Sequence, residues 1–372
     1  MTYCRGCILP DTRPSIVIGP DGVCNACSQH ARKATIDWAA REQLFLGLVS
    51  RIKARRAKYD CLIPVSGGKD STWQVVKCLE LGLHPLAVTW RSPARTAIGQ
   101  ANLDNLVRLG VDHIDYQINP KVEARFAREA FVRQGNPAIP MHFGLFNIPL
   151  TIASAMDIPL VVYGENSAFE YGGDDDAASG FALNAKWRLT HGVNGGTMPG
   201  DWAGEALSRA DLTPYFGPTD RELEAKQIAA VFLGYYYAWD PQATAAVAMA
   251  NGFQANPGGP RTGFYDFADI DDDFISVHHF LKWFKFGITR TFDNLSLEIR
   301  NERLTRDQAI ELLRQRGAEI PTEDIRQFCE FIGMTVQEFW TVAERFRNHE
   351  IWSRQAGQWV IRGFLVPDWT WT

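Results

Sequence analysis

The most constraining feature of this chain is a short loop, SGGKDS at residues 66–71, set between an apolar run and a helical pattern. Residues 61–65 predict a buried strand, and the apolar residues from Trp73 to Leu79 recur at helical spacing. A strand, a glycine-rich turn and a helix start together make an anion site, because unpaired backbone N–H groups and the helix dipole point at one spot. The sequence therefore predicts a phosphate-binding loop.

This loop differs from the common nucleoside-triphosphate loop. The pattern GxxxxGK[ST] needs Gly at position 63 and Ser or Thr at position 70, where this chain has Ile63 and Asp70. The loop instead resembles the SGGxDS signature of the PP-loop ATP pyrophosphatases, which bind the pyrophosphate end of ATP and transfer AMP to a substrate oxygen. A surface turn that contains Gly-Gly-Lys by chance is the alternative. On this resemblance, the ATP-binding residues are Ser66, Gly67, Gly68, Lys69, Asp70 and Ser71.

Apolar runs alternate with helical patterns after this loop. Further strands are predicted at residues 85–90, 113–118 and 158–163, with helices between them. This rhythm predicts an α/β fold with a doubly wound, mainly parallel sheet, and the PP-loop resemblance implies the adenine-nucleotide α-hydrolase-like version of it. Ligands of such sheets bind off the carboxyl ends of the strands.

The turn that follows the strand at residues 158–163 belongs to that edge of the sheet. Its acids could hold Mg²⁺ against the ATP phosphates, with Glu165 as the first choice and Glu170 as the second. A polar turn without a function is the alternative. The catalytic candidates are therefore Lys69, Asp70 and Glu165. The candidates for the substrate side in this turn are Asn166, Glu170 and Tyr171.

Two basic residues flank Gly287 in the C-terminal part of the chain, which reads as mainly helical. Lys285 and Arg290 could reach the ATP phosphates from a second domain. Basic residues beside Phe284 and Phe286 fit an ordinary amphipathic helix equally well.

Four of the seven cysteines form two CxxC pairs near the N-terminus: Cys4, Cys7, Cys24 and Cys27. Their spacing matches a tetrahedral zinc ribbon, and the turn-rich stretch between the pairs suits a unit that needs a metal to fold. Four thiolates leave no open coordination position, so we interpret the zinc as structural. An iron–sulfur cluster is the alternative.

The chain of 372 residues has room for two or three domains. Its net charge of −5 argues against a nucleic-acid partner, and the absence of a long apolar window or a signal-peptide pattern predicts a cytoplasmic protein without membrane contact. Residues 174–176, three aspartates, are expected to be solvated. The expected domains are a zinc ribbon at 1–35, an ATP-binding α/β domain at 36–255 with an insertion near 173–220, and a mainly helical domain at 256–372.

AMP transfer calls for a nucleophile that later displaces AMP. Sulfur transfer usually needs a reactive cysteine near the loop, and neither Cys61, Cys78 nor Cys329 is well placed. Ammonia from glutamine needs a glutaminase, but residue 2 is Thr2 and no GxCxG elbow is present. We therefore expect a separate glutaminase subunit, or free ammonium, to supply nitrogen.

Motifs spread over nearly the whole chain point together to one family. They are CRGCILPDTRP at 4–14, GVCNAC at 22–27, PVSGGKDS at 64–71, GEN at 164–166, FEYGG at 169–173, FLGYY at 232–236, KFG at 285–287, EIR at 298–300 and FRN at 346–348. Jointly they resemble the N-acetyl sugar amidotransferases of bacterial surface-polysaccharide and flagellar-glycan biosynthesis. That family includes enzymes that amidate pseudaminic- or legionaminic-type sugars and an O-antigen N-acetylmannosaminuronate derivative.

The resemblance implies that ATP adenylates the oxygen of an acetamido group and that ammonia then displaces AMP, which leaves an acetamidino group. It implies ATP, Mg²⁺ and structural Zn²⁺, a sugar or nucleotide-sugar substrate, a glutaminase like that of imidazole-glycerol-phosphate synthase, and a cyclase-like companion. The chain departs from the family in two places: it reads PMHFG at 140–144 where His-Cys is expected, and Asp293-Asn294 where Asp-His is expected. His142 is therefore a further substrate-side candidate, and the sugar itself could differ.

A tRNA thiolation enzyme of the same superfamily, which pairs such a loop with a Cys4 metal or iron–sulfur site, is the alternative function. The net acidity and the lack of a suitably placed cysteine count against it. A non-catalytic scaffold is a third reading, which the intact loop disfavours.

Overall fold

A computed structural model describes residues 1–371 of the chain. Its central sheet has five strands in the order β3-β2-β1-β4-β5, and every neighbouring pair is parallel. The α/β fold with a parallel sheet is thus confirmed. The strands are β1 (Cys61–Pro64), β2 (Pro85–Trp90), β3 (Asp112–Tyr116), β4 (Leu160–Tyr163) and β5 (Ala229–Phe232).

Helices cover both faces of this sheet because successive strand residues point to opposite sides. Ile63 packs with one group of helices and Leu62 with the other. The first face is covered by α2 (Trp38–Ala54), α3 (Lys69–Glu80) and α4 (Ala97–Arg108). The second face is covered by α5 (Pro120–Gln134), α6 (Ile139–Ala155) and α10 (Asp220–Ala225).

The main departures from prediction are local. The strand predicted at residues 61–65 ends at Pro64, a position where the missing N–H of proline is tolerated in a central strand. The sequence predicts a helix near 145–156, but α6 begins at Ile139 because Pro140 stands in its first turn, where a fixed φ favours helix. β5 was not predicted, because its alanines extend the helical pattern of α10.

The insertion near 173–220 is not a long loop: it is folded and packs against the helices on the second face of the sheet. It contains α8 (Asp175–Ser179), α9 (Ala185–His191) and two short 3₁₀ turns. Its aromatic residues Trp202 and Tyr215 are fully buried and pack around Phe126 of α5. The insertion therefore extends the hydrophobic core on the second face of the sheet.

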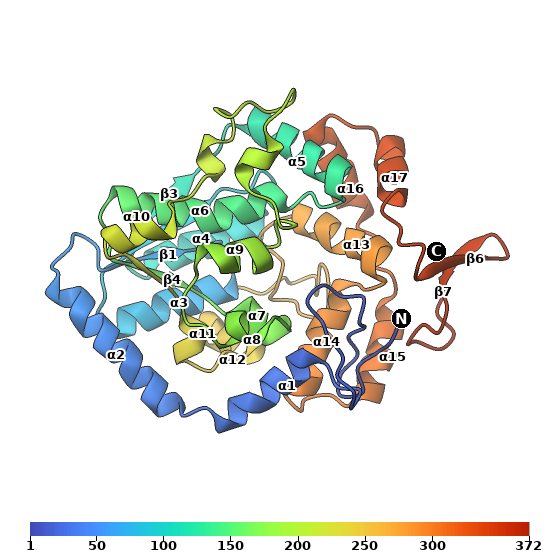
Figure 1. Ribbon diagram of the computed structural model, residues 1–372, viewed down its shortest axis with the longest axis horizontal. Coiled ribbons are helices and arrows are strands. Elements are labelled where there is room, and N and C mark those ends of the chain that lie inside the picture. Colours follow the sequence, from blue (N-terminus) through green and yellow to red (C-terminus); the bar gives the residue numbers. More distant parts are fainter. Residues whose placement is uncertain (372) are drawn as a thin grey trace.

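The C-terminal region is mainly helical, as predicted, and ends in a hairpin (Figure 1). The N-terminal ribbon does not have a separate core: Ile8 and Leu9 lie in one hydrophobic cluster with the C-terminal helices. Among the described residues, no helix has the length and apolar character needed to cross a membrane. The elements here are α13 (Phe274–Phe286), α14 (Arg290–Arg300), α15 (Arg306–Arg316), α16 (Thr322–Ile332), α17 (Val336–Glu344), β6 (Trp352–Gln355) and β7 (Gln358–Ile361).

Candidate active site

The predicted loop lies at the switch point of the sheet. β1 and β4 are adjacent, and the chain continues from β1 towards β2 on one side and from β4 towards β5 on the other. Loops that leave two such strands separate and form a crevice at the carboxyl edge. The loop at residues 66–71 follows β1, and the turn at residues 164–173, which we call the Glu165 turn, follows β4. The two sequence motifs therefore meet at one edge.

The backbone of the loop at residues 66–71 lies close to α4 and leaves N–H groups free at the start of α3. Gly67 has φ of +91°, and a Cβ there would lie 2.8 Å from the carbonyl oxygen of Gly99. Gly68 caps α3 without a side chain, so the first N–H groups of the helix stay free for an anion. The Ser66 hydroxyl accepts from Gly68 N–H at 3.2 Å, and the Ser71 hydroxyl donates to the Gly68 carbonyl oxygen at 2.9 Å.

Lys69 and Asp70 form a fixed charged pair at the start of α3. Lys69 is only 5% exposed, and its Nζ lies 2.6 Å from Asp70 Oδ2. Asp70 Oδ1 also accepts from Trp239 Nε1 at 2.9 Å and from the Thr244 hydroxyl at 3.2 Å. Trp239 and Thr244 belong to the segment that follows β5. This segment therefore fixes the position of the Asp70 carboxylate, which pairs with Lys69.

Glu165 lies beside this pair. Burial raises the pKa of Glu165 to about 7, with a further increase from the negative charge of Asp70, which Lys69 partly offsets. Within residues 1–371, Glu165 has no ion-pair partner. Two repelling carboxylates beside a phosphate loop suit a divalent cation with oxygen ligands, so the residues fit the predicted Mg²⁺.

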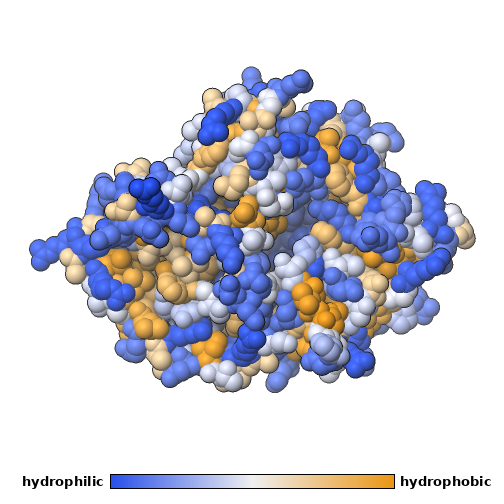
Figure 2. Space-filling view, viewed as in Figure 1, coloured by the Kyte–Doolittle hydropathy of each residue, from blue (hydrophilic) through white to orange (hydrophobic). Residues whose placement is uncertain are grey.

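A cavity of about 560 Å³ opens next to Glu165, between the sheet edge and the C-terminal helices. Figure 2 shows a hollow near the centre of the molecule, between its two halves. Its walls come from the ribbon, the Glu165 turn, α9, α13 and α14. Of the predicted site residues it brings together Glu165, Tyr171, His142, Lys285 and Arg290.

The cations on the C-terminal wall differ in their partners. Burial lowers the pKa of Lys285 to about 8, and in the described part of the chain no carboxylate pairs with it. Lys282 has the same pKa of about 8 for the same reason, although Asp293 lies 4.0 Å away. Arg290 is held by Asp269 at 2.8 Å. Lys285 is therefore the cation most available to a bound anion.

Three histidines line the same wall: His142, His278 and His279. Burial lowers the pKa of His142 and of His279 to about 4, so both are neutral near pH 7. His142 donates to the Ala138 carbonyl oxygen at 2.7 Å, whereas both ring nitrogens of His279 are buried without a hydrogen-bond partner among the described residues. His279 Nε2 lies 3.6 Å from Asp269 Oδ1, so Nδ1 is the ring nitrogen that is left for a ligand.

Sequence reasoning missed several cavity residues. Arg13, Asp269, His278, His279, Lys282 and Asp293 were not predicted as site residues. His278, Lys282 and Lys285 are spaced four and three residues apart, so they share one face of α13. That spacing indicates one polar face on the helix, but the polar residues of a solvent-exposed helix face have the same spacing.

Two substrate-side candidates, Asn166 and Glu170, do not line this cavity. Asn166 caps α7 (Ser167–Tyr171), and its amide donates to the Ala177 carbonyl oxygen at 2.7 Å. Glu170 is buried and accepts from Lys33 Nζ at 2.7 Å, on the side of the turn that faces the ribbon. Both residues stabilise the Glu165 turn through these contacts, and both line a smaller pocket beside the ribbon.

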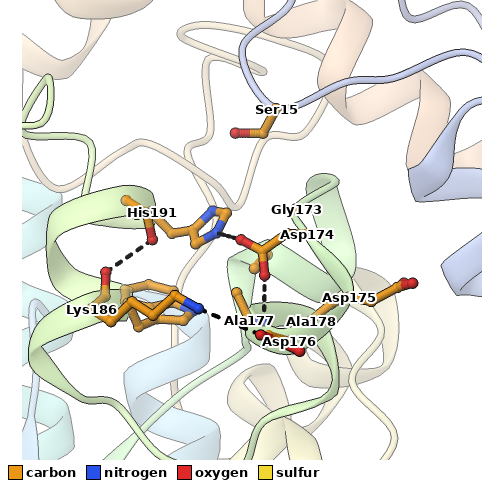
Figure 3. A network of polar contacts seen from close by, with 12 residues as sticks. Ser15, Gly173, Asp174, Asp175, Asp176, Ala177, Ala178, Lys186 and His191 are labelled. Atoms are coloured by element: carbon orange, nitrogen blue, oxygen red, sulfur yellow. Dashed lines mark hydrogen bonds and ion pairs between the residues drawn. The ribbon is translucent and has the colours of Figure 1, made fainter.

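The three aspartates are solvated, as expected. Asp175 and Asp176 have side chains 76% and 87% exposed. Asp174 accepts from Ala177 N–H at the start of α8 and lies 3.1 Å from His191 Nε2 of α9, as Figure 3 shows. Asp174 therefore joins α8 to the α9 end that borders the cavity.

The four ribbon cysteines surround one point. Their Sγ atoms all lie within 4.8 Å of one another, with Cys4–Cys27 at 3.9 Å and Cys7–Cys24 at 3.7 Å. Zn–S bonds of about 2.3 Å in a tetrahedron put sulfurs roughly 3.8 Å apart, whereas a multi-iron cluster would separate them further. The residues present fit a single metal ion.

The ribbon also contacts the cavity walls. Arg13 Nε lies 2.6 Å from Asp293 Oδ1 on α14, and Arg13 Nη1 donates to the Tyr171 carbonyl oxygen at 2.9 Å. Gln29, on α1 (Asn25–Arg32), donates to the Gly173 carbonyl oxygen at 2.9 Å. A folded ribbon is therefore needed to place the Glu165 turn.

Residues 261–364 match the family model described as LPS biosynthesis protein WbpG-like, C-terminal domain. Among solved structures, NMN synthetase from Francisella tularensis is 13% identical, with 80% of this chain and 94% of that chain covered and a TM-score of 0.35. No curated protein matches the chain. The matched residues include the helices α13 and α14, which form the C-terminal wall of the cavity.

Proposed function

We propose that the protein is an ATP-dependent amidotransferase that converts an acetamido group of a bacterial surface-glycan sugar into an acetamidino group. One observation supports the proposal: a single cavity lies between the Glu165 turn, at the sheet edge that also carries the loop at residues 66–71, and the helical wall within the residues that match the lipopolysaccharide-biosynthesis family model. The loop offers a pyrophosphate site, and the opposite wall offers cations and neutral histidines for a polar, anionic sugar derivative.

In the first step, the amide oxygen attacks the α-phosphorus of ATP, and pyrophosphate leaves. The N–H groups at the start of α3 and the Lys69 ammonium stabilise the leaving pyrophosphate. When bound, Mg²⁺ neutralises charge on the phosphates, and Glu165 with Asp70 would hold it. An amide oxygen is a weak nucleophile, so alignment of the two reactants in the cavity supplies much of the rate.

In the second step, ammonia adds to the carbon of the O-adenylyl imidate, and AMP leaves. A neutral His279 on the cavity wall can accept the proton that the new C–N centre releases. None of the cysteines in residues 1–371 lines the cavity, and Cys61, Cys78 and Cys329 are buried in hydrophobic cores. This arrangement favours nitrogen over sulfur transfer, and hence the amidotransferase over the tRNA thiolation enzyme.

The direct test is mass spectrometry of free and nucleotide-activated N-acetyl sugars incubated with the protein, ATP, Mg²⁺ and ammonium. The expected product is lighter by about one mass unit, with AMP and pyrophosphate formed in equal amounts. K69A should abolish turnover, whereas K77A, on the exposed side of the same helix, should retain it. Turnover by K69A would refute the assignment of the loop.

We further propose that the nitrogen comes from a partner glutaminase of the imidazole-glycerol-phosphate-synthase type, with a cyclase-like companion. The chain alone should then use ammonium but not glutamine, and addition of the glutaminase should restore glutamine-dependent turnover. Efficient use of glutamine by the isolated chain would refute the need for a partner.

A further inference from the structure

Five acidic side chains are buried among the described residues. Burying a carboxylate is costly unless a cation pairs with it. Three of the five have such a partner within 2.7 Å: Glu170 with Lys33, Asp293 with Arg13, and Glu298 with Arg303. The other two, Glu123 and Asp272, pair with no cation in the described part of the chain, and they are only 3% and 9% exposed.

Glu123 and Asp272 line the same small cavity, which has a volume of about 30 Å³. That volume exceeds what one water-sized molecule needs. Most of the other lining is apolar and includes Met141, Phe274 and Phe328. Two acids that have no cation partner in residues 1–371 thus share an otherwise apolar chamber, which is large enough for one small polar molecule.

The carboxyl groups keep free acceptor capacity. Glu123 Oε1 accepts from Trp90 Nε1 at 2.8 Å, while Oε2 has no hydrogen-bond partner within residues 1–371. Asp272 Oδ1 accepts from Phe274 N–H at 2.8 Å, with the Ser92 hydroxyl nearby. Burial raises the pKa of Glu123 to about 8 and that of Asp272 to about 7. Both groups can therefore gain or lose a proton near neutral pH.

The chamber lies between the surface and the active-site cavity. Pro93, which is exposed, forms part of its wall. Ile275 lines both the chamber and the large cavity, so its side chain forms part of the wall between them. The start of α6 also runs between the two, since Ala138 lines the chamber and His142, hydrogen-bonded to Ala138, lines the large cavity.

We propose that this chamber binds ammonium and delivers ammonia to the active site, an inference that rests on the proposed amidotransferase function. Ammonium has the size of a water molecule, and its N–H groups and positive charge match two unpaired carboxylates. An ammonium N–H bond breaks as its proton moves to the Glu123 carboxylate, and neutral ammonia passes Ile275 to the imidate carbon. The proton on Glu123 returns to water on the Pro93 side before the next cycle.

Steady-state kinetics with ammonium chloride as the nitrogen donor test this role. E123Q and D272N should each raise KM for ammonium by about tenfold or more, while KM for ATP stays within about twofold of wild type; E123Q, which removes the proton acceptor, should also lower kcat at saturating ammonium, whereas D272N should not. E129Q, on the same helix α5 but outside the chamber, is the matched control. I275W, which enlarges the separating side chain, should lower kcat/KM for ammonium without weakening ATP binding.

The outcomes separate the two proposals. If wild type turns over with ammonium but E123Q and D272N keep its ammonium KM, the chamber has no role and the inference fails. If wild type makes no ammonium-dependent product from any sugar, the proposed function fails, and the binding measurement below decides on the chamber.

Ammonium binding can be measured without turnover by thermal unfolding in ammonium, potassium and sodium chloride at equal ionic strength. A cation that binds only the folded protein raises its Tm. Wild type should be more stable in ammonium than in either metal salt, and E123Q and D272N should lose that difference. Equal stabilisation by potassium, or none by ammonium, would overturn an ammonium site.

Discussion

Replacing Arg13 with Gln tests whether the ribbon holds the active-site turn in place. The Arg13–Asp293 pair has an N–O distance of 2.6 Å, and the two side chains are 15% and 1% exposed. Removing one partner of a buried pair costs about 3–5 kcal/mol when the other charge is left unpaired. Asp293 keeps Arg290 at 3.7 Å and Lys282 at 4.0 Å, so its charge stays compensated in part. With loss of the hydrogen bond to Tyr171, we expect R13Q to cost roughly 2–3 kcal/mol.

The pair also predicts how this stability depends on pH. Burial would raise the pKa of Asp293, but the charges of Arg13, Lys282 and Arg290 hold it well below its ordinary value. A carboxyl with a lowered pKa stabilises the folded state fully above its unfolded-state pKa of about 3.9, and loses this contribution as the pH falls below that value. The difference between wild type and R13Q should therefore be largest near neutral pH and shrink under acid.

Urea unfolding of the metal-loaded protein, followed by tryptophan fluorescence, measures this cost. R32Q is the control, because Arg32 pairs with the exposed Asp175 and exposed pairs add little. A double-mutant cycle of R13Q with D293N isolates the pair itself. If R13Q is no more destabilising than R32Q, the ribbon is not anchored to α14 through this contact, and the reasoning is wrong.

Three further outcomes are expected. Gly67→Ala should weaken ATP binding in a nucleotide titration, because its Cβ would lie 2.8 Å from the Gly99 carbonyl oxygen at a positive φ; unchanged affinity would contradict the loop geometry. The kcat/KM for the proposed reaction should rise through about pH 7, as Glu165 ionises to hold Mg²⁺, and fall above about pH 8, as Lys285 loses its proton. K285R should remove the alkaline limb, because an arginine stays charged. Metal analysis should find one zinc and no iron per chain, and a strong chelator should abolish both activity and the native fluorescence spectrum; a coloured iron–sulfur centre would contradict a single ion.

The sheet and its loop were predictable because their signals are local. The strand before Ser66, the glycines and the helix after Asp70 are contiguous, and the parallel topology then fixes which edge Glu165 occupies. β5 escaped prediction because four residues, two of them alanine, do not distinguish a strand from the end of a helix.

The opposite wall of the cavity was not predictable in the same way. His279 and Lys282 reach the Glu165 turn only through packing between segments more than a hundred residues apart, and their local pattern is that of any amphipathic helix. The orientation of Glu170 depends likewise on Lys33, 137 residues earlier in the chain. Contacts between segments so far apart in the chain produce no recognisable sequence pattern around either residue.

The shared core of the ribbon and the C-terminal helices sets the order in which a nascent chain can become active. The Thr12 hydroxyl donates to the Phe286 carbonyl oxygen, and Arg306 Nε donates to the Cys7 carbonyl oxygen, across 274 and 299 residues; in Figure 1 the N-terminal ribbon lies beside α14 and α15. The ribbon leaves the ribosome before the C-terminal helices, and its apolar side is covered only after α14 and α15 have been synthesised. Until then its four thiolates and Ile8 and Leu9 are open to oxidation, to competing metals and to chaperones. Capture of the metal during translation would protect them.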